Sequence, residues 1–253
     1  MEIIGYSERG VINALFYEIA YSAKSLHLSK ELLALADCPS LVEFSQRMTK
    51  VRVFIEQSLS DFGDADAILL LDAEDKKGVV FVEAKVKSSQ RNEWKLELEF
   101  EKFKNGYNTS DKKLSSSNLF TQLYHKHRFL NGLSDVGIDG LKKGIVFPEC
   151  STKNTRKIGN NPVVLYAVNI IEPYRDNAWY IALVPDTSIA VRDFYTETAF
   201  RKLNGFSENR GKLSGVIITG LAEGRRSVKA ISPLDDLRRP DFTSMAYNFP
   251  WYL

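Results

Sequence analysis

Two short apolar runs, separated by a charged turn, constrain the fold of this chain more than any other feature. The first run occupies residues 64–71 (DADAILLL) and the second occupies residues 79–85 (VVFVEAK). Each run has the length of a β-strand, and the second begins with β-branched and aromatic residues. The residues between them are charged and end in Gly78, which is typical of a tight turn. The pattern predicts a β-hairpin with its apex near Glu74 or Asp75.

Charged side chains gather at the open end of this predicted hairpin. Antiparallel pairing about such an apex places Asp66 opposite or nearly opposite Glu83, with their β-carbons roughly 5 Å apart. Glu83 and Lys85 are two residues apart on one strand, so both side chains leave the sheet by the same face. Two carboxylates and an ammonium group are therefore expected to converge where the strands stop being apolar.

The two acids need a counter-charge, because carboxylates this close repel each other and one would take up a proton where water is excluded. A hard divalent cation removes the conflict, since Mg²⁺ prefers oxygen ligands, accepts one or two carboxylates and keeps several waters. Lys85 beside such an ion would orient or help to deprotonate a bound water, which then attacks a phosphorus. This interpretation predicts a phosphodiester-cleaving site. The alternative is a hairpin whose charged end is simply solvated, as most charged strand ends are.

The same residues resemble the signature of a known family. Asp66, sixteen intervening residues and then Glu83-Ala84-Lys85 are similar to the motif of the PD-(D/E)xK nuclease superfamily. The resemblance covers roughly residues 6–148 and implies a restriction-endonuclease-like core made of a helix, three strands, a second helix and a further strand. It also implies that Asp66 and Glu83 hold Mg²⁺ or Mn²⁺ with the Ala84 carbonyl as a third ligand. The implied substrate is nucleic acid, with DNA favoured.

Two positions qualify this resemblance. Ala65 stands where the family name has proline, at a position that is commonly relaxed. Asp64 is a second acid on the same strand face as Asp66, so the residues alone leave the choice of ligand open. Asp66 is preferred because it directly precedes the apolar run and pairs better with Glu83.

Three further residues are candidates for the site. A helix is predicted from Ser7 or Glu8 to about Ser22, and Glu8 falls on its apolar stripe. Glu8 either meets solvent and the helix dipole or, as the resemblance implies, assists beside the metal. Gln122 and Lys126 lie four apart on a helix predicted from about Asn118 to Leu130. The resemblance implies that they orient a phosphate or the catalytic lysine, and the alternative is an ordinary solvated helix face.

The remaining pattern indicates a mixed α/β protein with this core at residues 1–150 and an extension at 151–253 packed on the same domain. Residues 161–168 fit either a helix starting at Pro162 or a buried strand. The other predicted elements are a helical stretch at 29–47 broken at Pro39, strands at 51–56, 145–147, 179–184 and 215–219, and a helix at 192–203.

Composition limits the class of protein and its partners. The formal net charge of the 253 residues is only +2, so any nucleic-acid surface must be a local patch. Cys38 and Cys150 are too few for a disulfide framework and indicate a reducing compartment, so a cytoplasmic protein is expected. No signal segment and no membrane-spanning run are apparent, so no membrane partner is expected, and a homodimer is one assembly open to the chain. Two other classes stay open: a catalytically inactive nuclease-fold module that binds nucleic acid, and a protein-interaction domain.

Overall fold

A computed structural model of the chain describes residues 8–34, 36, 38–84, 118–146, 155–184 and 215–218. Their helices are α1 (Glu8–Tyr21), α2 (Ser25–Ala34), α3 (Pro39–Gln46), α5 (Leu119–Lys143) and α6 (Pro162–Ile171), with short 3-10 turns η1 (Ser60–Phe62) and η2 (Glu172–Tyr174). Their strands are β1 (Met48–Ser58), β2 (Asp64–Ala73), β3 (Lys76–Ala84), β4 (Ile145–Val146), β5 (Thr155–Arg156), β6 (Ala178–Val184) and β7 (Gly215–Ile218).

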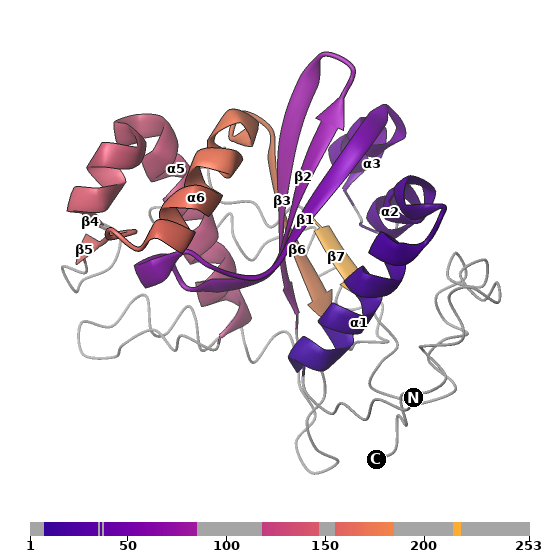
Figure 1. Cartoon of the computed structure of the whole chain (residues 1–253), viewed down its shortest axis with the longest axis horizontal. Coiled ribbons are helices and arrows are strands. Elements are labelled where there is room, and N and C mark those ends of the chain that lie inside the picture. The colour runs from indigo at the N-terminus through magenta and orange to yellow at the C-terminus, as the bar shows by residue number, and fades with distance from the viewer. Residues whose placement is uncertain are drawn as a thin grey trace, which may run out of the picture.

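A five-stranded mixed sheet organises these elements, in the order β1-β2-β3-β6-β7. The pairs β1–β2 and β2–β3 are antiparallel, whereas β3–β6 and β6–β7 are parallel. Helices α1, α2 and α3 lie on one side of the sheet, and α5 and α6 lie on the other (Figure 1). The mixed α/β class predicted from the sequence is confirmed.

The central hairpin has the geometry that its sequence predicts. Strands β2 and β3 pair from Ala73–Lys76 to Ala67–Val82, which leaves Glu74 and Asp75 as the turn. Side chains alternate between two hydrophobic cores: Ile68 and Leu70 pack on the α5 side, while Leu69 and Leu71 pack on the α1 side. Both faces of the hairpin are buried, and for this reason its apolar runs are nearly continuous instead of alternating with polar residues.

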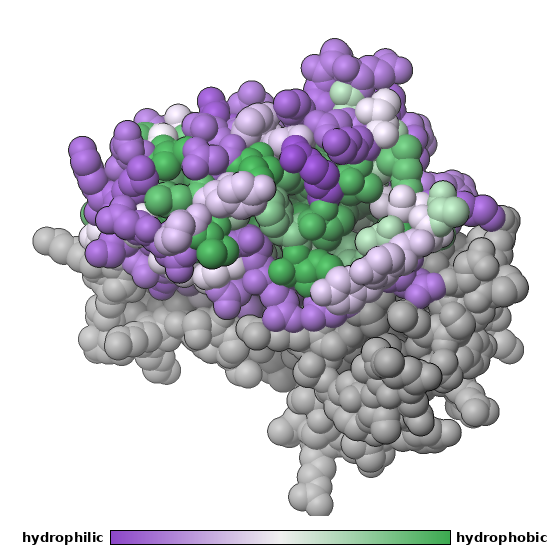
Figure 2. Space-filling view, viewed as in Figure 1, coloured by the Kyte–Doolittle hydropathy of each residue, from purple (hydrophilic) through white to green (hydrophobic). Residues whose placement is uncertain are grey.

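The edge strand β1 is less buried than its neighbours. Its residues Val51, Val53, Phe54 and Ile55 are partly buried and pack against one or the other core. Figure 2 shows hydrophobic surface in the middle of the same view, over the sheet between α6 and the helices α1–α3.

The N-terminal helices follow their local sequence signals. The predicted first helix is confirmed as α1, and its apolar stripe buries Ile12 and Ile19 in the α1-side core. The predicted helical stretch from 29 to 47 is two helices, because Pro39 cannot continue a helix and instead occupies the first turn of α3.

The strand predicted at 145–147 is found at residues 145–146, but its predicted place as the fourth strand of the core is wrong. Residues 145 and 146 form β4, whose one partner among the described strands is the two-residue β5, in a separate small sheet. The strand that lies beside β3 is β6, which comes from the segment assigned to the extension. Strand β6 has seven residues, whereas β4 has two, so only β6 is long enough to run alongside β3 from Val79 to Ala84.

The C-terminal half settles one open alternative. Residues 162–171 form helix α6, so the strand alternative for 161–168 is wrong. The reason is local: the Asn161 side chain accepts a hydrogen bond from the Val163 N–H at 2.9 Å, and Pro162 occupies the first helical position. The strands predicted at 179–184 and 215–219 are confirmed as β6 and β7. Lys85, Phe147 and the predicted helix at 192–203 lie outside the described residues.

Candidate functional site

The open end of the hairpin brings Asp66 to the strand that carries Glu83. The last regular pair of the hairpin is Ala67–Val82, and one further step of the same register would set Asp66 opposite Glu83. The Asp66 Oδ2 atom accepts a hydrogen bond from the Ala84 N–H at 2.7 Å. The carboxylate of one strand is therefore held against the backbone of the other, directly after Glu83.

Glu83 points toward helix α5. Its neighbours Val82 and Ala84 belong to the α1-side core, whereas Phe81, two residues before it, packs in the α5-side core. Strand alternation then puts the Glu83 side chain on the α5 side. The Glu83 side chain is 0% exposed, and its Oε1 atom lies 2.9 Å from the Nζ atom of Lys126, which is also 0% exposed. Two opposite charges thus form an ion pair inside the protein.

Backbone carbonyl groups complete the surroundings of the Lys126 ammonium. It donates to the carbonyl oxygen of Asp64 at 2.8 Å and to that of Phe62 at 3.3 Å. The turn between them bends at Gly63, whose φ of +81° suits glycine, and a β-carbon there would lie 3.3 Å from the ammonium. The segment from η1 to the start of β2 therefore wraps around a cation.

This arrangement explains how a charged lysine can be buried. An isolated ammonium in a protein interior is costly, and the cost is offset only when the charge is paired and its donors are satisfied. Here one carboxylate oxygen and two carbonyl oxygens meet the ammonium. The solvated helix face considered for Lys126 is wrong, because the side chain points into the fold.

A sequence signal for the buried Lys126 exists, although helix periodicity has to be followed over a longer window to see it. Lys126 continues an apolar stripe at spacings of three and four, with Leu119 and Leu123 before it and Leu130 and Leu133 after it. All four leucines belong to the α5-side core. A lysine in the middle of such a stripe predicts a buried cation with a partner.

Gln122, the other candidate on this helix, lies one turn before Lys126 and is half-buried. Its Oε1 atom is shielded from solvent and accepts no hydrogen bond from the described residues. The helix begins beside it, where the Asn118 side chain accepts the Thr121 N–H at 3.1 Å. Gln122 therefore places a solvent-shielded amide oxygen close to the start of α5.

The two histidines of α5 are buried for packing. Burial, and then the charges of Arg156 and Lys126, lower the pKa of His125 to about 3, so its ring is neutral at pH 7. The His127 ring meets Tyr180 edge-to-face at 5.5 Å, and its Nε2 atom lies 3.0 Å from the Asn131 amide nitrogen.

The donor set matches a divalent ion by type, but one donor is already in use. Mg²⁺ takes oxygen ligands and one or two carboxylates, which Asp66 and Glu83 could supply. However, the Glu83 carboxylate already faces the Lys126 ammonium at 2.9 Å. Within the described ranges, no group of three or more His, Cys, Asp or Glu side chains is arranged to hold a metal. A divalent ion can therefore bind this oxygen of Glu83 only if the Lys126 ammonium moves away from it.

For two of the predicted catalytic residues, Lys85 and Glu8, the structure does not describe the side chain. Lys85 follows Ala84, the last residue of β3, and lies outside the described residues. Glu8 opens helix α1, and its side chain also lies outside the described part of the chain. The Ala84 side chain packs in the α1-side core, and Ala84 pairs with Leu183 of β6.

A second polar cluster, which sequence reasoning missed, lies at the other end of the hairpin. The Tyr174 hydroxyl donates to Asp72 Oδ1 at 2.8 Å and accepts a hydrogen bond from Arg52. Arg52 and Lys77 also lie over the Tyr174 ring, 5.5 and 5.3 Å from its centre. Burial and the Asp72 hydrogen bond raise the pKa of Tyr174. The hydrogen bond between Tyr174 and Asp72 ties η2 to the hairpin across 102 positions of sequence.

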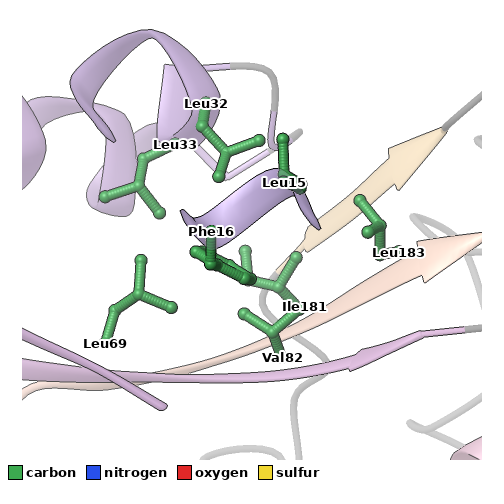
Figure 3. Close-up of a pocket in the computed structure, with 8 residues that line it drawn as sticks. All are labelled: Leu15, Phe16, Leu32, Leu33, Leu69, Val82, Ile181 and Leu183. Carbon is green, nitrogen blue, oxygen red and sulfur yellow. The ribbon is translucent and has the colours of Figure 1, made fainter. Parts of the chain in front are cut away.

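The pocket on the opposite side of the sheet carries no polar chemistry. It lies between the sheet and helices α1 and α2, and Figure 3 shows only apolar side chains around it. Its volume of about 10 Å³ is near the lower limit for a single water. It is a packing gap in the α1-side core.

Comparisons with known proteins do not assign the chain to a family. No family model, no curated protein and no solved structure matches it. None of the helices in the described part of the chain combines the length and the apolarity needed to cross a bilayer.

Proposed function

We propose that this protein is a divalent-metal-dependent phosphodiesterase that hydrolyses nucleic acid, with DNA as the favoured substrate. The observation that carries the proposal is the hydrogen bond from the Ala84 N–H to Asp66 Oδ2, at 2.7 Å. It holds one carboxylate beside the strand position of another, at the end of an otherwise apolar hairpin. Acids are seldom placed this way in a fold without a cation to balance them.

The order of the elements also supports the proposal. Helices α1, α2 and α3 precede the antiparallel strands β1, β2 and β3, which are followed in the described residues by α5, β4, β5 and α6 and then by β6, which is parallel to β3. With α2, α3, β4, β5 and α6 set aside as additions, this is the order that the resemblance to the PD-(D/E)xK superfamily implies. A restriction-endonuclease-like core is therefore the finer form of this proposal.

Each residue then has a stated role. Asp66 and Glu83 hold Mg²⁺ or Mn²⁺, with the Ala84 carbonyl as a third ligand. Bound metal supplies charge stabilisation at the phosphorus and lowers the pKa of a bound water. Lys85, one residue beyond β3, orients that water or removes its proton. Glu8 assists from α1, and Gln122 contacts a phosphate from α5.

Cleavage of defined DNA substrates tests this proposal. Linear, circular and single-stranded DNA are incubated with the protein and Mg²⁺ or Mn²⁺. We expect cleavage that D66N abolishes and that K85A reduces by about 10²–10⁴-fold, the usual contribution of a general acid or base. D75N is the matched control, because Asp75 lies in the exposed turn at the far end of the same hairpin. Failure to cut any substrate, or equal cutting by K85A, would contradict the proposal.

A second function has one observation in its favour. The Lys126 ammonium already balances the charge of Glu83, so this carboxylate needs no metal as its counter-charge. This favours a catalytically inactive module that binds nucleic acid through phosphates. Calorimetry separates the two functions: the module binds DNA but shows no heat of Mn²⁺ binding, and its DNA affinity falls steeply with salt. A chain with neither affinity would be a protein-interaction domain.

A further inference from the structure

The Lys126 ammonium lies in a site built from oxygen atoms. Its three neighbours are a carboxylate oxygen of Glu83 at 2.9 Å and the carbonyl oxygens of Asp64 at 2.8 Å and Phe62 at 3.3 Å. Neither charged side chain is exposed, and Gly63 leaves the room that the ammonium fills. Carboxylate and carbonyl oxygens are also the ligands that hard metal cations take. The Lys126 ammonium thus pairs with the Glu83 carboxylate, which is also a ligand of the proposed metal.

We propose that Lys126 is a resident cation that competes with the divalent metal for Glu83, and that its ammonium leaves Glu83 when the metal binds. This inference rests on the proposed function, because it concerns the same site. It assigns to Lys126 a positioning role: its ammonium holds the Glu83 carboxylate against the carbonyl groups of Asp64 and Phe62 at the end of the hairpin before metal binds.

Competition follows from charge and space. An ammonium and a divalent ion that share one buried carboxylate oxygen would be only a few ångströms apart, and their repulsion is strong where water is excluded. A divalent ion on the second oxygen, Oε2, would still lie on the same buried carboxylate, so repulsion disfavours occupancy of Glu83 by both cations. A ligand that binds only the minor, open state loses apparent affinity in proportion to the fraction of molecules in that state. Because the closed pair is fully buried, we expect the open state to be a small fraction.

Metal affinity measured in matched variants tests the competition. K126M removes the ammonium and keeps an unbranched side chain of similar length. We expect Mn²⁺ to bind K126M at least about tenfold more tightly than wild type by calorimetry, as expected when less than about a tenth of the wild-type molecules are open. K142M is the control, because Lys142 lies on the same helix and pairs with Asp139 at 3.1 Å on the surface. The K142M variant should bind Mn²⁺ like wild type. The E83Q/K126M variant should bind Mn²⁺ at least about tenfold more weakly than K126M, because the Glu83 carboxylate is gone.

The outcomes separate this inference from the proposed function. Equal Mn²⁺ affinity of wild type and K126M would overturn the competition and leave the phosphodiesterase proposal standing. Absence of Mn²⁺ binding in both proteins would overturn both.

A second measurement needs no substitution, in case K126M does not fold. Wild-type protein is treated with a limiting amount of acetic anhydride, with and without saturating Mn²⁺, and each lysine is followed by peptide mass spectrometry. We expect Lys126 to be protected without metal and modified several-fold faster with it, while Lys142 is modified equally in both. Continued protection of Lys126 in the Mn²⁺-saturated protein would overturn the inference.

Discussion

Breaking the buried pair between Glu83 and Lys126 should cost this protein much of its stability. Both side chains are 0% exposed, so replacing Glu83 by glutamine leaves an ammonium without its counter-charge in the interior. Removal of one partner of a buried ion pair typically lowers the free energy of unfolding by about 3–5 kcal/mol. A protein of this class has only about 5–15 kcal/mol in total, so E83Q should be severely destabilised.

The structure also sets the loss in the free energy of unfolding that is expected for a control variant and for the double variant. Asp139 and Lys142 form a pair on the same helix α5, but their side chains are 88% and 34% exposed, so D139N should cost about 0–1 kcal/mol. K126M should cost about as much as E83Q, because it leaves the carboxylate alone. The double variant E83Q/K126M carries no buried charge, and its loss should be smaller than the sum of the single losses by about 2 kcal/mol or more.

Urea denaturation followed by far-ultraviolet circular dichroism at pH 7 measures these differences, provided that the slope of the transition stays unchanged. The reasoning is refuted if E83Q unfolds within about 1 kcal/mol of wild type, the range of an exposed pair. It is also refuted if the losses of E83Q and K126M simply add within about 0.5 kcal/mol, because independent sites behave in that way.

Three further outcomes are expected from other parts of the fold. N118A should lower the free energy of unfolding by about 1 kcal/mol in urea titrations, because the Asn118 side chain caps α5 through the Thr121 N–H at 3.1 Å. G78A should cost about 1–3 kcal/mol and alter the tryptophan fluorescence, because a β-carbon at Gly78 would lie 2.5 Å from the Trp179 ring. His125 has its pKa lowered to about 3, so the unfolded chain binds a proton that the native protein does not, and stability should rise with pH between about 3 and 6.5. In that window His125 should contribute a slope of up to about 1.4 kcal/mol per pH unit, and H125Q should remove it.

Each of these outcomes has an observation that would contradict it. A cap at Asn118 is absent if N118A and wild type unfold at the same urea concentration. Close packing at Gly78 is excluded by unchanged fluorescence and stability in G78A. A proton nuclear magnetic resonance titration in which the His125 ring protonates near pH 6 would show that the ring is not desolvated as its burial requires.

Local patterns determined much of this fold. The hairpin could be predicted because its two strands are adjacent in sequence and its turn has a charged, glycine-ended composition, and the structure places its apex at Glu74 and Asp75 as expected. Helix α1 could be predicted from its apolar stripe, and the start of α6 from the pair Asn161 and Pro162. The placement of Asp66 beside the Glu83 strand follows from the same short-range register.

Only the tertiary structure decided which distant segments meet. Strand β6 lies beside β3 although about 100 residues separate them, as the pair Val79–Ala178 shows, and nothing local distinguishes the neighbour of a parallel strand. The burial of Lys126 was decided in the same way, because helix periodicity defines a face but not which acid that face will meet. Glu83 and Lys126 are far apart in sequence, and the free energy of burying two charges is favourable only when the folded chain brings them together.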